Sequence, residues 1–414
     1  MTSKQQKSLI FMAWLLYVSA YLGRYSYNSN ILPMSIFYGV SDTEMGLATS
    51  FFFFAYGAGQ IINGLLCKFY NVKYVLSGAL IISSIINAVV FLGVLPFSYI
   101  KFLWLINGIA QSVLWSSLLM VLSRNLDENH IKKAVIAMST TAGVGTLLSY
   151  TLSAALALFG GFRFAFLTGA VLMTASALVW VFIYDKITHK NAAEVLAGTA
   201  DTANIEKKKG DKSVIKILIL FGIFAIIINF IKDGLSTWVP KILFDTYTLS
   251  ESLSIILTLV LPVLAVFGTA LVVRLNKKVK EYTALIAILF ITATMLVGTI
   301  IGFLNTPLWI VVLIAFGCLA LLMSGANNVV TSILPLSLRD KANSGFLGGI
   351  LNGCCYVGST ISSVGLGAIS DHYGEWSPVF YLLLILTAIV VVLSVTVALI
   401  KYFKNKKNTK ATEN

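Results

Sequence analysis

Long charge-free stretches of apolar residues recur along the whole chain and alternate with short polar segments. A membrane-spanning helix needs about 20 mostly apolar residues, and eight of these stretches reach that length. They comprise residues 45–67, 74–100, 102–123, 134–162, 164–184, 252–273, 342–370 and 376–400. A longer stretch, 282–338, contains the turn signal Asn305-Thr306-Pro307 and therefore divides into two further spans.

Two more apolar stretches, 8–38 and 213–245, differ from the others because each carries charge near its middle. Counting them gives twelve spans, of which these two are spans 1 and 7. The composition agrees, because 58% of the 414 residues are hydrophobic and only 11% are charged. We therefore predict an all-α membrane protein with twelve transmembrane helices.

The lysines and arginines assign the orientation of these helices. With the N-terminus in the cytosol, all but five of the 30 lysines and arginines fall in cytosolic segments, as membrane proteins prefer. The net charge of +13 is thus mainly a topology signal, and nucleic-acid binding is not needed to explain it. Both termini are predicted to be cytosolic, and the protein to be a multi-pass protein of the cell inner or plasma membrane.

A polar, lysine-rich segment at 185–212 divides the chain in the middle and is typical of a flexible linker. Six spans precede it and six follow, which indicates two parallel repeats. We expect an N-terminal six-helix bundle at 1–184, a cytosolic loop at 185–212, a C-terminal bundle at 213–402 and a cytosolic tail at 403–414.

The charges in spans 1 and 7 occupy matching positions in the two repeats. Lys232 follows Arg24 by 208 residues, close to half the chain. Each lies roughly 25 Å of helix beyond the last cytosolic lysine before it, well inside the membrane. Pro33 and Pro240 follow at similar distances and predict either a bend or simply the end of each span.

A cation in the bilayer centre costs about 2.5–3.5 kcal/mol on insertion scales, so it should face a partner or a water-filled cavity. Helical spacing places Tyr21, Arg24 and Asn28 on one face of span 1, with Tyr25 beside them. In span 7, Asn229 shares a face with Lys232, and Asp233 lies on its flank. Two cations with one acid between them indicate a site for a small anion.

Other polar residues in the spans extend this candidate site. The proposed substrate-binding residues are Arg24, Lys232, Tyr21, Tyr25, Asn28, Asn229, Gln111, Asn107, Asn328 and Tyr356. Alternatives stay open for several of them. In the alternative for Arg24, the guanidinium forms a buried ion pair with Asp233. In that for Lys232, the side chain extends to the membrane interface. In that for the amides, each forms hydrogen bonds between helices without contacting a ligand. Asp233 is either an ion-pair partner or a proton-coupling site.

No enzyme signature is present in the sequence: there is neither a phosphate-binding glycine loop nor a nucleophile elbow. The four cysteines lack metal-ligand spacing. We therefore expect no enzymatic activity, no cofactor and no metal. The expected partners are a small anionic substrate and the lipid bilayer, without nucleic acid, and the protein is expected to be a monomer.

The arrangement resembles the major facilitator superfamily, and three stretches resemble its organophosphate:phosphate antiporter family. These are "YLGRYSYNSNILP" in span 1, "KDGLSTWVPKIL" in span 7 and "GLGAISDHYGEWSPVF" between the last two spans. The resemblance implies that Arg24 and Lys232 bind phosphate in an alternating-access carrier, with Tyr21, Tyr25 and Asn28 around them. Lys232 stands where the family pattern has arginine.

The leading hypothesis from the sequence is a secondary active transporter of a small anionic metabolite, such as an organophosphate or sugar phosphate exchanged for inorganic phosphate. The second is a proton-coupled symporter of a carboxylate or sugar acid, in which Asp233 titrates. The third is a non-transporting membrane receptor that binds an anion and signals through the 185–212 loop.

Overall fold

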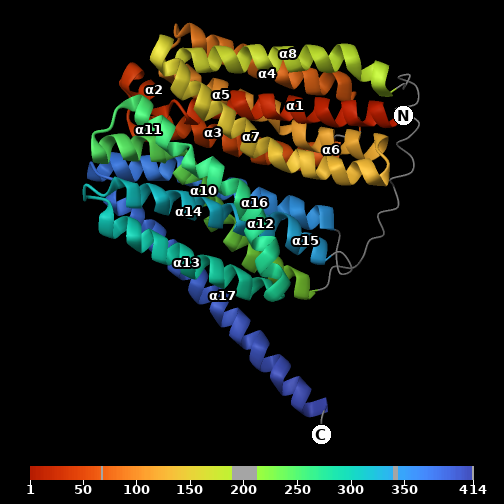
Figure 1. The fold of residues 1–414 in the computed structure, drawn as a ribbon, viewed down its shortest axis with the longest axis vertical. Coiled ribbons are helices and arrows are strands. Elements are labelled where there is room, and N and C mark those ends of the chain that lie inside the picture. Colours follow the sequence, from red (N-terminus) through yellow and green to blue (C-terminus); the bar gives the residue numbers. More distant parts are fainter. Residues whose placement is uncertain (67–68, 189–211, 339–343, 413–414) are drawn as a thin grey trace.

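The computed structural model describes residues 1–66, 69–188, 212–338 and 344–412, and their regular secondary structure is entirely helical. We call residues 1–188 the N half and residues 212–412 the C half. Figure 1 shows them as two stacks of roughly parallel helices that lie against each other. The fold is an all-α membrane fold of two six-helix halves, as predicted.

Six spans form the N half, and two of them are each built from two consecutive helices. The N half comprises α1 (Ser3–Asn28) with α2 (Ile31–Tyr38), α3 (Asp42–Leu66), α4 (Val72–Leu92), α5 (Phe97–Ser112) with α6 (Leu114–Asn125), α7 (Glu128–Gly160) and α8 (Arg163–Thr188). Local capping sets where some of them begin. Thr2 and Gln5 form a capping box before α1, and the Asp127 side chain accepts a hydrogen bond from the His130 amide at the start of α7.

The C half repeats this plan. It comprises α10 (Lys212–Tyr247), α11 (Glu251–Thr258) with α12 (Val260–Lys278), α13 (Tyr282–Phe303), α14 (Trp309–Asn328) with η2 (Val329–Ile333) and α15 (Leu334–Ser337), α16 (Ser344–Tyr373) and α17 (Ser377–Thr412). Within the described residues, ten helical stretches are long and apolar enough to cross a membrane. The two remaining spans are formed by α1 with α2 and by α16, and they share the polar residues of the site described below with α10 and α14.

Two helices extend into segments that the sequence analysis assigned to the loop and to the tail. Helix α8 continues to Thr188 and α10 begins at Lys212, and the rest of the predicted loop, residues 189–211, lies outside the described residues. Helix α17 continues to Thr412, so the predicted tail is helical over almost its whole length. Figure 1 shows α17 projecting from the C half.

The two matching prolines act differently from each other. Span 1 changes direction at Ser29 and Asn30, before Pro33, whereas α10 runs through Pro240 without a break. Of the two expectations for Pro240, the end of the span is therefore wrong. Proline has no N–H for the carbonyl four residues earlier, and the Ser236 carbonyl instead accepts a hydrogen bond from the Tyr150 hydroxyl of α7. This bond joins the two halves.

On the outer side, opposite the cytosolic termini, the halves are joined by polar contacts that we call the outer latch: Asp42, Thr43, Lys241, Asp245 and Asp371. The Asp371 carboxylate of α16 accepts hydrogen bonds from the backbone amides of Asp42, at 2.9 Å, and Thr43, at 2.7 Å. It thereby caps the N-terminus of α3 across the interface between the halves. Lys241 of α10 lies 3.5 Å from Asp42 and 3.0 Å from Asp245.

Small residues let α3 and α16 approach closely behind this latch. A Cβ atom at Gly46 of α3 would lie 2.2 Å from the Ser363 carbonyl oxygen of α16. Further along, the Ser50 hydroxyl donates to the Thr360 carbonyl at 2.7 Å. Close packing and the latch together seal the outer side of the molecule between the two halves.

We expect Asp371→Ala to weaken the outer seal. Loss of a helix cap costs about 0.5–2 kcal/mol, so the outward-open population should rise roughly tenfold. The measurement is the labelling rate of a cysteine introduced at Ser50, using a membrane-impermeant maleimide applied from outside. Glu375→Ala is the matched control, because this exposed carboxylate contacts Ser377 in the adjacent turn. Equal labelling rates in the two variants would contradict a role for the cap.

Candidate functional site

A cavity of about 900 Å³ lies between the two halves and opens toward the cytosolic side. Its walls come from the cytosolic portions of α3, α6, α7, α12, α14 to α15 and α16. It ends in the middle of the membrane at Arg24 and Lys232, and the outer latch lies beyond. The structure is therefore open to the cytosol and closed to the outside.

Arg24 is held against the N half by aromatic rings. Its side chain is buried, and the guanidinium carbon lies 4.6 Å from the ring centre of Tyr21, 4.9 Å from that of Phe52 and 4.3 Å from that of Tyr56. Electron-rich ring faces stabilise a cation without neutralising it. The guanidinium thus keeps its full positive charge at the end of the cavity.

Two buried amides lie behind this arginine. Gln111 accepts a hydrogen bond from Arg24 Nε at 3.1 Å and donates to Asn107 at 3.1 Å. Both amides are fully buried, and neither lines the cavity. They therefore orient the guanidinium from behind. Arg24 Nη2 is buried and has no hydrogen-bond partner among the described residues, which is unfavourable until a ligand supplies an acceptor.

Lys232 has a different environment from its counterpart. Its ammonium donates to Asn229 Oδ1 at 2.9 Å and lies 3.2 Å from Asp233 Oδ1. The second carboxylate oxygen of Asp233 accepts from the Ser359 hydroxyl of α16. Of the alternatives left open by the sequence, an Asp233 ion pair is thus formed with Lys232 and not with Arg24. Lys232 does not extend to the interface.

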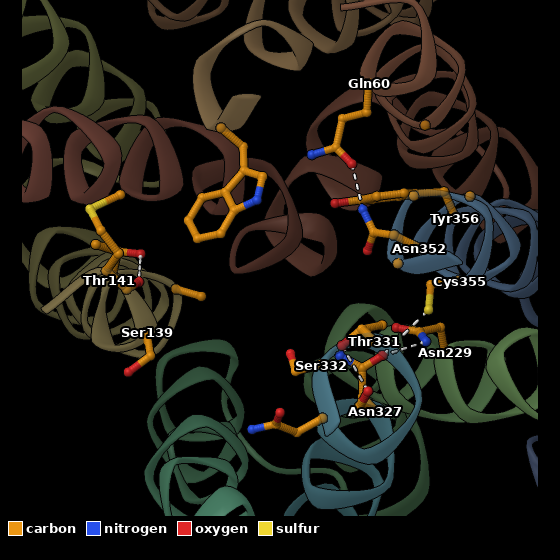
Figure 2. A pocket seen from close by; sticks show the side chains of 18 of the residues that line it. Gln60, Ser139, Thr141, Asn229, Asn327, Thr331, Ser332, Asn352, Cys355 and Tyr356 are labelled. Atoms are coloured by element: carbon orange, nitrogen blue, oxygen red, sulfur yellow. Dashed lines mark hydrogen bonds between the residues drawn. The ribbon is translucent and has the colours of Figure 1, made fainter. Parts of the chain in front are cut away.

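The C half lines the cavity with amides and hydroxyls, as Figure 2 shows. Asn229 donates to Asn327 at 2.9 Å, and Asn352 of α16 donates to Gln60 of α3. The π-helical turn η2 lies directly after α14 and places Thr331 and Ser332 at the same wall. Such turns often occur at functional sites, because they shift side chains relative to a regular helix.

The predicted residues divide into two groups. Those that line the cavity are Arg24, Lys232, Tyr21, Tyr25, Asn229, Asn328 and Tyr356, together with Asp233. Asn107 and Gln111 lie behind Arg24, and Asn28 donates across the closed interface to Thr237 at 2.9 Å. These three amides were interpreted as ligand contacts because helical spacing gives the face of a residue but not its depth.

Several lining residues were missing from the predicted set. They are Gln60, Trp115, Asn327, Asn352, Thr331, Ser332 and other small polar residues of α7 and α14. A signal existed for some of them. Asn327 and Thr331 are four residues apart, as are Asn328 and Ser332, so each pair would share a helix face. The hydroxyls were too common in the spans to stand out.

Comparison with known proteins identifies relatives of this architecture. Residues 13–344 match the model of the Major Facilitator Superfamily. A hexuronate transporter of Bacillus subtilis (strain 168) is 25% identical over 400 residues, which cover 92% of each chain.

Solved structures with low sequence identity share the fold. A D-xylose-proton symporter has a TM-score of 0.72 at 13% identity, over 94% of this chain and 96% of that one. A bacterial homologue of the human lysosomal transporter Spinster, in an inward-facing and occupied conformation, has a TM-score of 0.71 at 16% identity, over 95% and 96%. The nucleoside transporter NupG has a TM-score of 0.71 at 14% identity, over 95% and 98%.

We expect thermal unfolding to identify the partner of Asp233. Lys232→Gln and Asp233→Asn should each destabilise the protein, and the double variant should lose less than their sum, by about 1–2 kcal/mol. The measurement is tryptophan fluorescence during heating in detergent. The matched cycle pairs Arg24→Gln with Asp233→Asn and should be additive. Additive effects of Lys232→Gln and Asp233→Asn, together with non-additive effects of Arg24→Gln and Asp233→Asn, would contradict the ion pair between Lys232 and Asp233.

Proposed function

Since this chain belongs to the Major Facilitator Superfamily, we propose that it is a secondary transporter that carries a sugar acid across the plasma membrane. It is a multi-pass membrane transporter and not an enzyme. In the proposed cycle, the two halves rock about the central site, which opens alternately to the cytosol and to the outside.

The observation that carries this proposal is the division of the cavity into a cationic end and a polar wall. Arg24 retains an unsatisfied guanidinium nitrogen and has no carboxylate partner among the described residues. A planar guanidinium matches the two oxygens of a carboxylate. The opposite wall offers Asn327, Asn352 and Thr331, whose amides and hydroxyl are suited to the hydroxyl groups of a sugar.

One relative supports the same class of substrate. The hexuronate transporter is named for a sugar acid, and it aligns with nearly the whole chain. Of the two substrate classes that the sequence left open, sugar acids therefore have more support than organophosphates. Exchange of an organophosphate for phosphate is the competing form of the proposal, and the transport assay includes it.

Proton coupling is a second feature that belongs to this proposal. Asp233 is the carboxylate that lines the cavity in the described part of the chain, and its pair with Lys232 is next to the route of the substrate. Accumulation of substrate that follows an imposed pH gradient, and that is lost in Asp233→Asn, would support a proton symporter. Uptake that is insensitive to the gradient would assign exchange or passive transport.

The proposed function predicts counterflow in liposomes loaded with glucuronate or galacturonate. Glucose, glucose 6-phosphate and inorganic phosphate are the competing internal substrates. Arg24→Gln should reduce kcat/KM for the sugar acid by roughly 30-fold or more, because it removes a buried charged partner worth about 2–5 kcal/mol.

Arg163→Gln is the matched control for this assay. Arg163 is also an N-half arginine on an aromatic ring, 4.4 Å from the ring centre of Phe37, but it lies outside the cavity. The KM of this variant for the sugar acid should equal that of the wild type. Exchange of glucose 6-phosphate and phosphate without exchange of sugar acids would overturn the proposal in favour of the organophosphate class.

A further inference from the structure

Resting on the proposed function, we propose that Asp233 determines which substrate charge the site prefers. By pairing with Lys232, it leaves one net positive charge in the site. The site then selects singly charged sugar acids over doubly charged sugar phosphates and dicarboxylates.

The charges of the cavity give this count. Among the described residues that line it, those charged in their ordinary form at neutral pH are Arg24, Lys232 and Asp233. The other titratable side chains there are tyrosines and Cys355, whose ordinary form is neutral. Two cations and one anion leave a single positive charge for the substrate to balance.

Two contacts hold the Asp233 carboxylate next to the Lys232 ammonium. Asp233 is 6% exposed, and its two oxygens have different partners: Lys232 Nζ at 3.2 Å on one side and the Ser359 hydroxyl on the other. Lys232 is also held by Asn229, which in turn donates to Asn327. The lysine is therefore a neutralised part of the wall, while Arg24 remains the charged end.

Two cations of the outer side, Lys241 and Lys101, do not add to this charge. Neither of them lines the cavity, and each is paired with carboxylates: Lys241 contacts Asp42 and Asp245, and Lys101 contacts Glu44.

A second negative charge on the substrate would consequently meet an unfavourable environment. A phosphate monoester carries about −1.5 to −2 at neutral pH, whereas a uronate carries one charge. One charge is balanced by Arg24. The remaining charge would face Lys232 only together with the Asp233 carboxylate, which repels it.

The test is binding of glucuronate and glucose 6-phosphate to purified protein in detergent at neutral pH, by titration calorimetry. These probes share a pyranose ring and differ in the charge at carbon 6. In Asp233→Asn, the affinity for the phosphate relative to the uronate should rise roughly 10-fold to 30-fold, as expected for one charge at about 8 Å.

Two further variants make the expectation independent of any single substitution. Lys232→Gln leaves no net charge, so both affinities should fall and that for the phosphate should fall more. The double variant with both substitutions again has one net positive charge, and its preference ratio should return to that of the wild type. Arg163→Gln, which removes an N-half charge that does not line the cavity, is the matched control and should keep the wild-type ratio.

The outcomes separate this proposal from the proposed function. If the wild type binds glucuronate and the ratio is the same in all variants, Asp233 does not set charge selectivity, although the sugar-acid function stands. If the wild type binds glucose 6-phosphate more tightly than glucuronate, both are overturned. Opposite shifts in Asp233→Asn and Lys232→Gln, with a wild-type ratio in the double variant, support the proposal.

Discussion

A guanidinium in the middle of a membrane helix is the constraint on which the rest of this structure depends. Burial of Arg24 is unfavourable, and proteins usually offset such a charge with a carboxylate. Here it is stabilised by the rings of Tyr21, Phe52 and Tyr56 and by one amide, Gln111. These contacts hold the group in position but leave its charge. The proposed sugar-acid substrate would supply the missing negative charge.

The closed outer side makes this charge the end of a one-sided cavity. The halves meet there through the Asp371 cap on α3, the Asn28–Thr237 bond and the Tyr150 contact with the Ser236 carbonyl. The last contact exists because Pro240 leaves that carbonyl without its helical donor. Apolar packing also crosses the interface, because one buried cluster contains Phe52 and Tyr56 of the N half together with Leu351 and Leu366 of the C half. Opening of the outer side therefore requires both the polar contacts and part of this apolar packing to separate.

Much of this arrangement follows from sequence patterns, and the remainder depends on side-chain conformations. Apolar lengths and lysine positions were sufficient for the twelve spans, and the repeat placed Arg24 and Lys232 at one depth. Periodicity did not reveal that Gln111 supports Arg24 from behind. A helical wheel does not distinguish a residue that lines a cavity from one that lies behind a lining residue. Nor did it reveal which cation Asp233 would meet, since a flanking position on the helix is compatible with either partner. Thr331 and Ser332 reach the cavity from within the π-helical turn η2, and the sequence does not signal this turn.

The two cations at matching positions have different surroundings. Equivalent positions in span 1 and span 7 carry Arg24 and Lys232, but aromatic residues surround the first, and Asn229 and Asp233 surround the second. One half thus offers a charge and the other offers hydrogen-bonding groups. A symmetric pair of cations would suit a ligand with negative charge at both ends. A site with one charged end and one amide-rich end instead favours a ligand with an acid at one end and hydroxyls at the other, bound in a single orientation.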